Sequence, residues 1–169
     1  MKKTNNTGGD KLDRTGGKIT GDLDIGGALK QQGLQVVTRN KAQKNLTTVG
    51  WYRIAKFNYT VYSHSALVNI NTVYFYSNNM SISLIVNTGY DCNGSLNILN
   101  HFKNDLVIAH IRLAKENDIL YLEIYYNKSQ PNGVTAELLT FGRDLELVES
   151  INFESASSSE TEVARVSIS

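Results

Sequence analysis

Tyrosines beside amide, carboxylate and imidazole side chains form the first pattern in this sequence that predicts chemistry. They lie in three short segments rich in turn-forming residues. Aromatic rings offer an apolar surface on which a sugar ring can stack, and the polar neighbours can bind its hydroxyl groups. The segments therefore predict a receptor-binding surface for a glycan, although cross-strand packing would use many of the same tyrosines. The residues are Tyr59, Tyr62, His64, Tyr74, Tyr76, Tyr90, Asp91 and Asn93.

Familiar catalytic motifs do not occur in the sequence. It has no nucleophile elbow, no zinc-binding pair of helical histidines and no phosphate-binding Gly-Lys-Ser/Thr. Glu123 and Glu137 lie in expected strands and suggest a glycosidase pair, but outward-facing carboxylates are common in strands. The single cysteine, Cys92, excludes an intramolecular disulfide and a multi-cysteine metal site. We therefore predict no enzymatic activity, no catalytic residue, no cofactor and no metal.

Within residues 16–33, an apolar residue or a glycine recurs at every second position from Ile19 to Leu29. In an extended chain this alternation places all the apolar side chains on one face. One ribbon cannot bury that face alone, so the pattern predicts a symmetric assembly in which glycines allow close approach. The alternative is a Gly-rich linker ahead of a domain. The predicted trimer shaft core is Ile19, Gly21, Leu23, Ile25, Gly27 and Leu29.

Three stretches resemble bacteriophage fibre proteins. The run LDRTGGKITGDLDIGGALKQQG (12–33) is similar to their Gly-Gly-x-hydrophobic-x-Gly-Asp-hydrophobic shaft segments. GWYRIAKF (50–57) and HIRLAKENDILYLEIYYNKSQPNGVTAELL (110–139) are similar to the β-structured heads of such fibres. The resemblance implies a homotrimeric virion appendage, a tail fibre or a capsid head fibre, with a shaft and a receptor-binding or decorating head.

The composition excludes several other classes of protein. The 169 residues carry 17 basic and 16 acidic side chains, a net charge of +1, so no nucleic-acid partner is expected. No apolar run is long enough to cross a membrane, and the N-terminus lacks the apolar core of a signal peptide. These features predict a chain that is made in the cytoplasm, which suits the assembly in the host cytoplasm and the location on the virion surface that the resemblance implies.

The strand pattern predicts an all-β fold. From Gly50 onward, eight or nine short alternating segments are separated by turn residues, as in an antiparallel β-sandwich or jelly-roll head. The polar residues 39–48 suggest a neck with a possible helical turn, and residues 154–162 suggest a solvated loop. The predicted domains are a flexible virion-attachment segment (1–15), a Gly-rich trimeric β shaft and neck (16–47), and a β-sandwich head (48–169).

The segment GWYRIA contains the only tryptophan and leaves two orientations open. Either Trp51, Arg53 and Ala55 face inward, or Tyr52 and Ile54 do. Arg53 is expected to stack on an aromatic ring or to pair with a carboxylate at a subunit contact.

These observations together predict a trimeric structural fibre protein of a phage. Its N-terminus would attach to other virion structural proteins, and its head would bind a host-surface glycan or protein. The alternatives are a carbohydrate-binding module of a cell-wall enzyme and, less favoured, a phage polysaccharide depolymerase.

Overall fold

The computed structural model describes residues 29–31, 34–58, 63–73, 79–89, 92–142, 148–157 and 159–169, with side chains for 41–57, 63–73, 79–89, 92–140, 152–157 and 159–169. Within these residues the chain forms strands and no α-helix, hence no helix that could span a membrane. The strands are β1 (Leu29–Gln31), β2 (Leu34–Leu46), β3 (Gly50–Asn58), β4 (His64–Val73), β5 (Met80–Thr88), β6 (Gly94–Lys103), β7 (Ile108–Glu116), β8 (Ile119–Tyr126), β9 (Asn132–Gly142), β10 (Val148–Ser155) and β11 (Thr161–Ser167).

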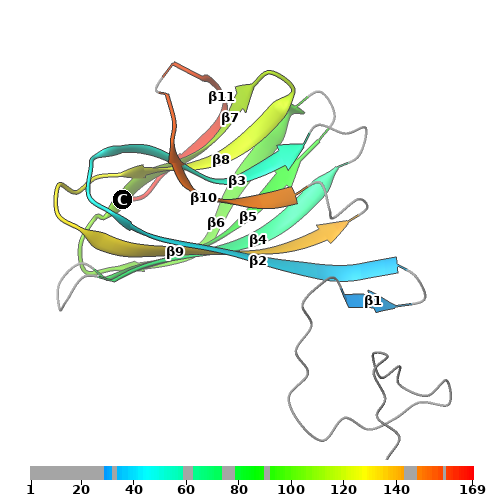
Figure 1. The fold of residues 1–169 in the computed structure, drawn as a ribbon, viewed down its shortest axis with the longest axis horizontal. Helices are drawn as coiled ribbons and strands as arrows, with labels where there is room; N and C mark the ends of the chain where they lie inside the picture. The colour runs from blue at the N-terminus through cyan, green and yellow to red at the C-terminus, as the bar shows by residue number, and fades with distance from the viewer. Residues whose placement is uncertain are drawn as a thin grey trace, which may run out of the picture.

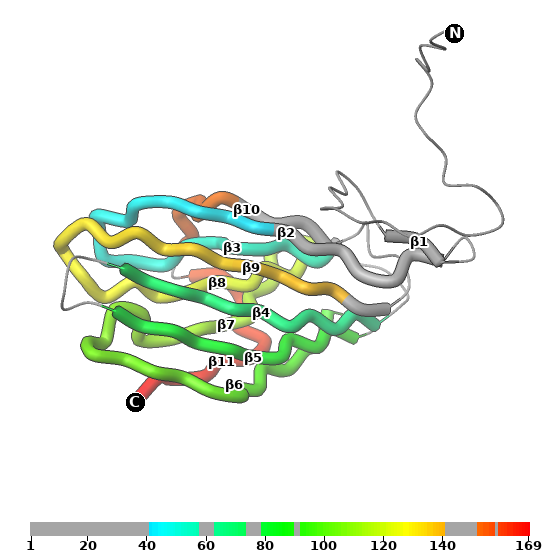
Figure 2. Tube along the Cα trace, turned by 90° about the horizontal axis from the view of Figure 1, so that it is seen from below, coloured from blue at the N-terminus to red at the C-terminus, as the bar shows by residue number. Residues whose placement is uncertain are grey.

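The strands form two antiparallel sheets that pack face to face (Figure 1). The six-stranded sheet has the order β1-β2-β9-β4-β5-β6, and the five-stranded sheet has the order β10-β3-β8-β7-β11. Seen from below, β2, β9, β4, β5 and β6 follow one another across the nearer sheet (Figure 2). β10 lies beside β2 at one edge and β11 beside β6 at the other. The predicted all-β, antiparallel class is confirmed.

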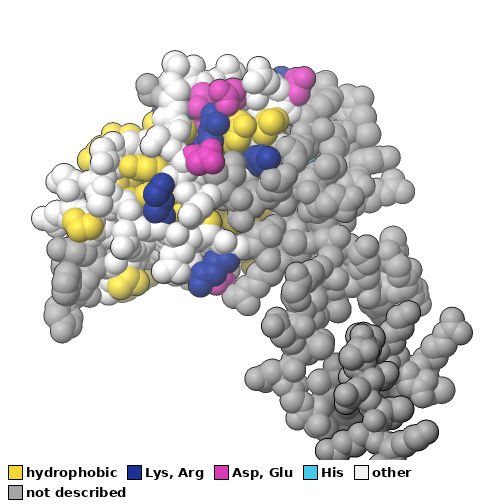
Figure 3. Space-filling model, viewed as in Figure 1, with side chains coloured by type: hydrophobic (Ala, Val, Ile, Leu, Met, Phe, Trp, Pro, Cys, Tyr) yellow, Lys and Arg dark blue, Asp and Glu magenta, His cyan; other side chains and the backbone are white. Residues whose placement is uncertain are grey.

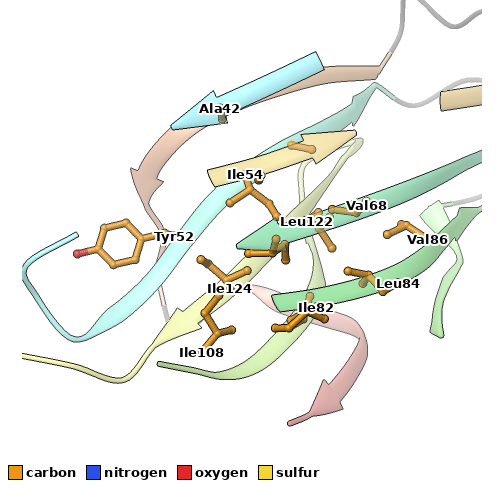
Figure 4. Close-up of a cluster of buried hydrophobic side chains, with 14 of the residues drawn as sticks. Ala42, Tyr52, Ile54, Val68, Ile82, Leu84, Val86, Ile108, Leu122 and Ile124 are labelled. Carbon is orange, nitrogen blue, oxygen red and sulfur yellow. The ribbon is translucent and has the colours of Figure 1, made fainter. Parts of the chain in front are cut away.

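The core lies between the sheets, as the alternation of more and less buried side chains along β4 and β5 shows. Val68, Ile82 and Leu84 of one sheet face Ile54 and Leu122 of the other (Figure 4). Each of these five side chains is fully buried, which is worth about 1.5–3 kcal/mol per residue before the entropy of ordering is subtracted. The apolar rows that the sequence predicted on these strands therefore form the core.

β2 shows that the expected neck belongs to the six-stranded sheet. It pairs with β9 from Thr38 opposite Thr140 to Leu46 opposite Asn132. Ala42 and Leu46 are buried in the core, whereas Lys41, Gln43 and Asn45, which face the other side of the strand, are exposed. The polar composition that suggested a neck is thus the solvated face of a strand, and no helical turn forms there.

The predicted shaft core lies almost entirely outside the described residues. Ile19, Gly21, Leu23, Ile25 and Gly27 belong to the part of the chain that is not described. Leu29 begins β1, whose backbone pairs with β2 opposite Val37. The trimeric shaft therefore stays a prediction.

Candidate functional site

The outer face of the six-stranded sheet carries a row of hydroxyl and amide side chains. Three serines donate hydrogen bonds to asparagines directly opposite on the neighbouring strand, at Oγ–Oδ1 distances of 2.7–2.9 Å. Since each amide accepts through oxygen, its NH2 group points to other partners. We call this surface the serine–asparagine face; its pairs are Ser65–Asn87, Ser83–Asn69 and Ser81–Asn71.

The serine–asparagine face continues onto β6 without a charged residue. Ser95, Asn97 and Asn100 of β6 lie opposite outward-facing positions of β5 and are exposed. Phe102 lies opposite Ser81 and is 62% exposed. An exposed ring thus borders uncharged hydrogen-bonding groups on β4, β5 and β6, and the nearest carboxylate across the sheet is Glu137 of β9, opposite Asn69.

The outer face of the five-stranded sheet has a different chemistry. Arg53 of β3, Glu123 of β8 and Arg112 of β7 lie directly opposite one another in register. The Glu123 carboxylate is fully buried and accepts from Arg112 Nε at 2.7 Å and from Arg53 Nε at 3.3 Å. We call these three residues, together with Glu160, the arginine–glutamate cluster. Figure 3 shows acidic and basic side chains side by side in the upper part of the view.

Aromatic rings hold both guanidinium groups in place. The Arg53 guanidinium carbon lies 3.7 Å from the centre of the Tyr121 ring, and that of Arg112 lies 4.1 Å from the Trp51 ring. Trp51 in turn meets Tyr125 edge-on at 5.2 Å. Stacking fixes the plane of a guanidinium and so directs its N–H groups.

The orientation that the sequence left open is now resolved. Trp51 and Arg53 face outward, whereas Tyr52 and Ile54 are buried in the core. Ala55 also lies in the core, because a bulge between Arg53 and Ala55 shifts the register. Arg53 stacks on the Tyr121 ring and pairs with carboxylates of its own chain, whereas the predicted subunit contact stays a prediction.

A segment between β10 and β11 crosses over this cluster. The two strands lie at opposite edges of the sheet, so residues 156–160, here called the strap, pass across its outer face. Ser158 is outside the described residues. The Ala156 amide donates to the Trp51 carbonyl at 2.9 Å, and Arg112 Nη2 donates to the Ser157 carbonyl at 2.6 Å. Arg53 Nη2 contacts Glu160 Oε1 at 2.6 Å.

The strap therefore differs from the solvated loop that its composition suggested. The side chain of Glu160 is only 8% exposed. Its pairing with Arg53 requires a fold in which β3 lies beneath a segment 107 residues later. Nothing in a Ser- and Glu-rich sequence indicates this contact.

The electrostatics of the cluster depend on two carboxyl groups in contact. Burial, together with the neighbouring Glu160, raises the pKa of Glu123 to about 7, although Arg112 opposes the shift. Burial would also raise the pKa of Glu160, but its contacts with Glu123, the Ser157 amide and Arg53 lower it overall. Glu123 thus takes up a proton more readily than its partner.

The predicted receptor-binding residues fall mostly outside the described residues. This holds for Tyr59, Tyr62, Tyr74, Tyr76, Tyr90 and Asp91. Asn93 is exposed, whereas His64 is only 3% exposed and so presents little surface to a ligand.

The suggested carboxylate pair does not come together. Glu137 faces outward from β9, opposite Asn69, whereas Glu123 lies on the outer face of the other sheet. Among the described residues, no three His, Cys, Asp or Glu side chains gather into a metal-binding group.

Comparison with protein-family models and with curated proteins gives no match. Among solved structures, the chain is similar to the tailspike protein of Acinetobacter phage vB_ApiP_P1, with 9% identity and a TM-score of 0.38, over 84% of this chain and 26% of that one. It is also similar to Pantoea stewartii WceF, with 11% identity and a TM-score of 0.40, over 80% of this chain and 22% of that one. The chain spans about a quarter of the length of either protein.

WceF is described as a glycan biofilm modifying enzyme with a bacteriophage tailspike-like parallel β-helix fold. The prediction that this chain is not an enzyme is corrected by this comparison. At TM-scores of 0.38 and 0.40 the likeness assigns no activity to this chain. The described strands all pair antiparallel, so this part of the chain is not a parallel β-helix.

Proposed function

We propose that the chain is a glycan-binding module of a trimeric phage appendage, which holds a neutral polysaccharide of the host surface on its serine–asparagine face. The observation that carries the proposal is the composition of this face. Its outward positions on β4, β5 and β6 bear hydroxyl, amide and apolar side chains and no charge. Solvated strands near a sheet edge commonly carry charged residues, which oppose edge-to-edge association.

The chemistry of the face matches that of a neutral sugar. Asn71 and Ser81 offer NH2 donors and hydroxyl acceptors, and glycan hydroxyls need both. The neighbouring ring of Phe102 offers an apolar surface for the C–H face of a sugar. Residues two positions apart along a strand repeat every ~6.6 Å, so one extended chain can meet several such groups.

Glycan binding is tested by titrating the full chain with purified neutral surface polysaccharides of candidate hosts. Phe102→Ala should weaken binding about fivefold, since a specific aromatic contact is worth ~1 kcal/mol. Its melting temperature should stay unchanged because the ring is 62% exposed. Glu162→Gln, a variant on the other sheet, is the matched control. Equal binding by all three proteins would refute the proposal.

The same titration should also be assayed for new reducing ends. This readout separates binding from cleavage. Cleavage has to be tested because WceF is described as a glycan biofilm modifying enzyme. Release of reducing ends by the unchanged chain would replace the binding module by a hydrolase.

The trimer is proposed from the alternation in the undescribed shaft. Three copies would bury one apolar row, and three heads would gain avidity for a repeating polysaccharide. Light scattering should give the mass of three chains. Leu23→Asp should disrupt the trimer and Asp22→Ala should not, since these neighbours face opposite sides of an extended chain. A monomeric parent protein would refute this part of the proposal.

A further inference from the structure

The arginine–glutamate cluster has its binding groups in place and holds a piece of its own chain. Glu123 binds the Nε atoms of both arginines from below. The Nη2 atoms meet further oxygens: Arg53 Nη2 contacts the carboxylates of Glu160 and Glu116, and Arg112 Nη2 contacts Glu123 and the Ser157 carbonyl. The strap thus supplies one carboxylate and one neutral oxygen to the two guanidiniums.

The strap satisfies this pair of arginines unevenly. Glu160 Oε1 lies 2.6 Å from Arg53 Nη2, but Oε2 lies 3.9 Å from Arg112 Nη2, beyond hydrogen-bonding distance. Oε2 is buried, no arginine N–H reaches it, and the contact between the carboxyl groups of Glu160 and Glu123 is the remaining interaction of this side chain within the cluster. A carboxylate placed between the guanidiniums could accept from both, which is the stronger, charge-assisted arrangement.

The strap is attached by polar contacts rather than by apolar packing. Its described residues are Ala156, Ser157, Ser159 and Glu160, none of them a large apolar side chain. Ser157 and Ser159 are exposed. Releasing the strap therefore exposes little apolar surface, and a ligand that offers the same oxygen groups can replace its contacts.

The charges and rings favour an anionic sugar as that ligand. Without Glu160, the two guanidiniums still face two carboxylates, the buried Glu123 and the exposed Glu116 at 2.8 Å from Arg53, so a ligand that displaces Glu160 restores the present balance of charge only if it carries a negative group. Tyr121 and Trp51 border the arginines. A uronic acid combines one carboxylate with adjacent hydroxyl and ring oxygens, the groups that the strap now imitates.

We propose that Arg53 and Arg112 form a binding site for the carboxylate of an acidic glycan, and that the strap occupies this site until such a ligand displaces Glu160. The site lies on the opposite side of the molecule from the serine–asparagine face. Failure of either proposal therefore leaves the other intact.

The first test is calorimetric titration of the full chain with trigalacturonic acid. Glu160→Gln should bind about tenfold more tightly than the unchanged chain, because a site occupied by its own strap loses affinity in proportion to that occupancy. Glu162→Gln is the matched control, since Glu162 pairs with Arg165 at 3.4 Å outside the cluster. Adding Arg53→Gln to Glu160→Gln should abolish the gain.

Two further probes define the ligand class. Maltotriose, which is neutral, should not respond to Glu160→Gln, and triglutamate should bind at least several-fold more weakly than trigalacturonic acid. Equal affinities for Glu160→Gln and Glu162→Gln would overturn the proposal. Equal affinity for maltotriose and trigalacturonic acid would also overturn it. If triglutamate bound as tightly as trigalacturonic acid, the site would be assigned to acidic peptides instead.

A second measurement needs no substitution. The Ala156 amide is held by the Trp51 carbonyl at 2.9 Å, and displacement of the strap should free it. Trigalacturonic acid should therefore raise hydrogen exchange at Ala156, while the Ile168 amide, bonded to the Ala109 carbonyl, should not change. Unchanged exchange at Ala156 in the saturated complex would contradict displacement.

Discussion

The two outer faces of this molecule share one pattern of pairing and differ in chemistry. On the six-stranded sheet, Ser83 pairs with Asn69 across neighbouring strands, and the surface is open. On the five-stranded sheet, Arg112 pairs with Glu123 in the same cross-strand way, but the strap covers the pair. Neutral groups can remain solvated without further partners, whereas buried charges need enclosing contacts on every side.

This difference implies different roles for the same kind of strand. The open face is available as it stands, so its variants should change binding and leave stability almost unaltered. The covered face contributes to the fold through fully desolvated groups, so its variants should change stability strongly. The predictions below separate these two expectations.

The largest effect is expected from removing β2, which belongs only to the six-stranded sheet. A chain starting at Thr47 loses the buried Ala42 and Leu46 and leaves β9 as an unpaired edge. Loss of one buried leucine costs about 2–5 kcal/mol, comparable with much of the stability of a domain. We expect no cooperative thermal transition by circular dichroism, whereas a chain starting at Leu34 should melt cooperatively. Identical melting of the two chains would show that β2 is dispensable.

The next largest effect is expected from Glu123→Ala on the covered face. It leaves two guanidiniums without their shared carboxylate, one of them with its side chain only 3% exposed. Removing one partner of a buried ion pair typically costs about 3–5 kcal/mol. Urea unfolding should show this loss. Glu137→Ala, on a half-buried position of the other sheet, is the matched control. Similar losses for both variants would mean that the covering strap adds nothing.

The pH dependence of stability should also arise from the covered face. Because the folded pKa of Glu123 is raised to about 7 from an ordinary 4.5, the folded state binds an extra proton between these values. The stability that this proton uptake at Glu123 contributes is full below pH 4.5 and is lost as pH rises through about 7. The lowered pKa of Glu160 acts in the opposite sense, so its contribution is lost only in acid. Urea midpoints should therefore fall from pH 5.5 to pH 8, and Glu123→Gln should flatten this fall. An unchanged slope in that variant would contradict the assignment.

The sequence predicted the strands better than the contacts between them. Met80, Ile82, Leu84 and Val86 all lie in the core, as the alternation in this segment requires, because a period of two determines which face of a strand is buried. Alternation did not identify residues 39–46 as part of a sheet strand, since Ala42 and Leu46 are the buried apolar residues among 41–46.

The arginine–glutamate cluster was not predictable for a different reason. Arg53 was expected to find a ring and a carboxylate, but its partners lie 63 to 107 residues away. Local sequence carries no information on register between such distant strands. Glu160 in particular lies in a segment whose composition is typical of a solvated loop.

The smallest effect is expected within the serine–asparagine face itself. Ser83 donates to Asn69 at 2.7 Å in a half-buried pair, and a cross-strand polar pair is worth about 0.2–1 kcal/mol. A double-mutant cycle with Ser83→Ala and Asn69→Ala should therefore give a coupling energy below about 1 kcal/mol in urea unfolding. In the same cycle measured by polysaccharide titration, the loss of binding free energy should be larger, because Asn69→Ala also removes the contact between the Asn69 NH2 group and the glycan. If the loss in stability instead equals the loss in binding, the pair acts only through the fold, and the open face has no direct contact with the ligand.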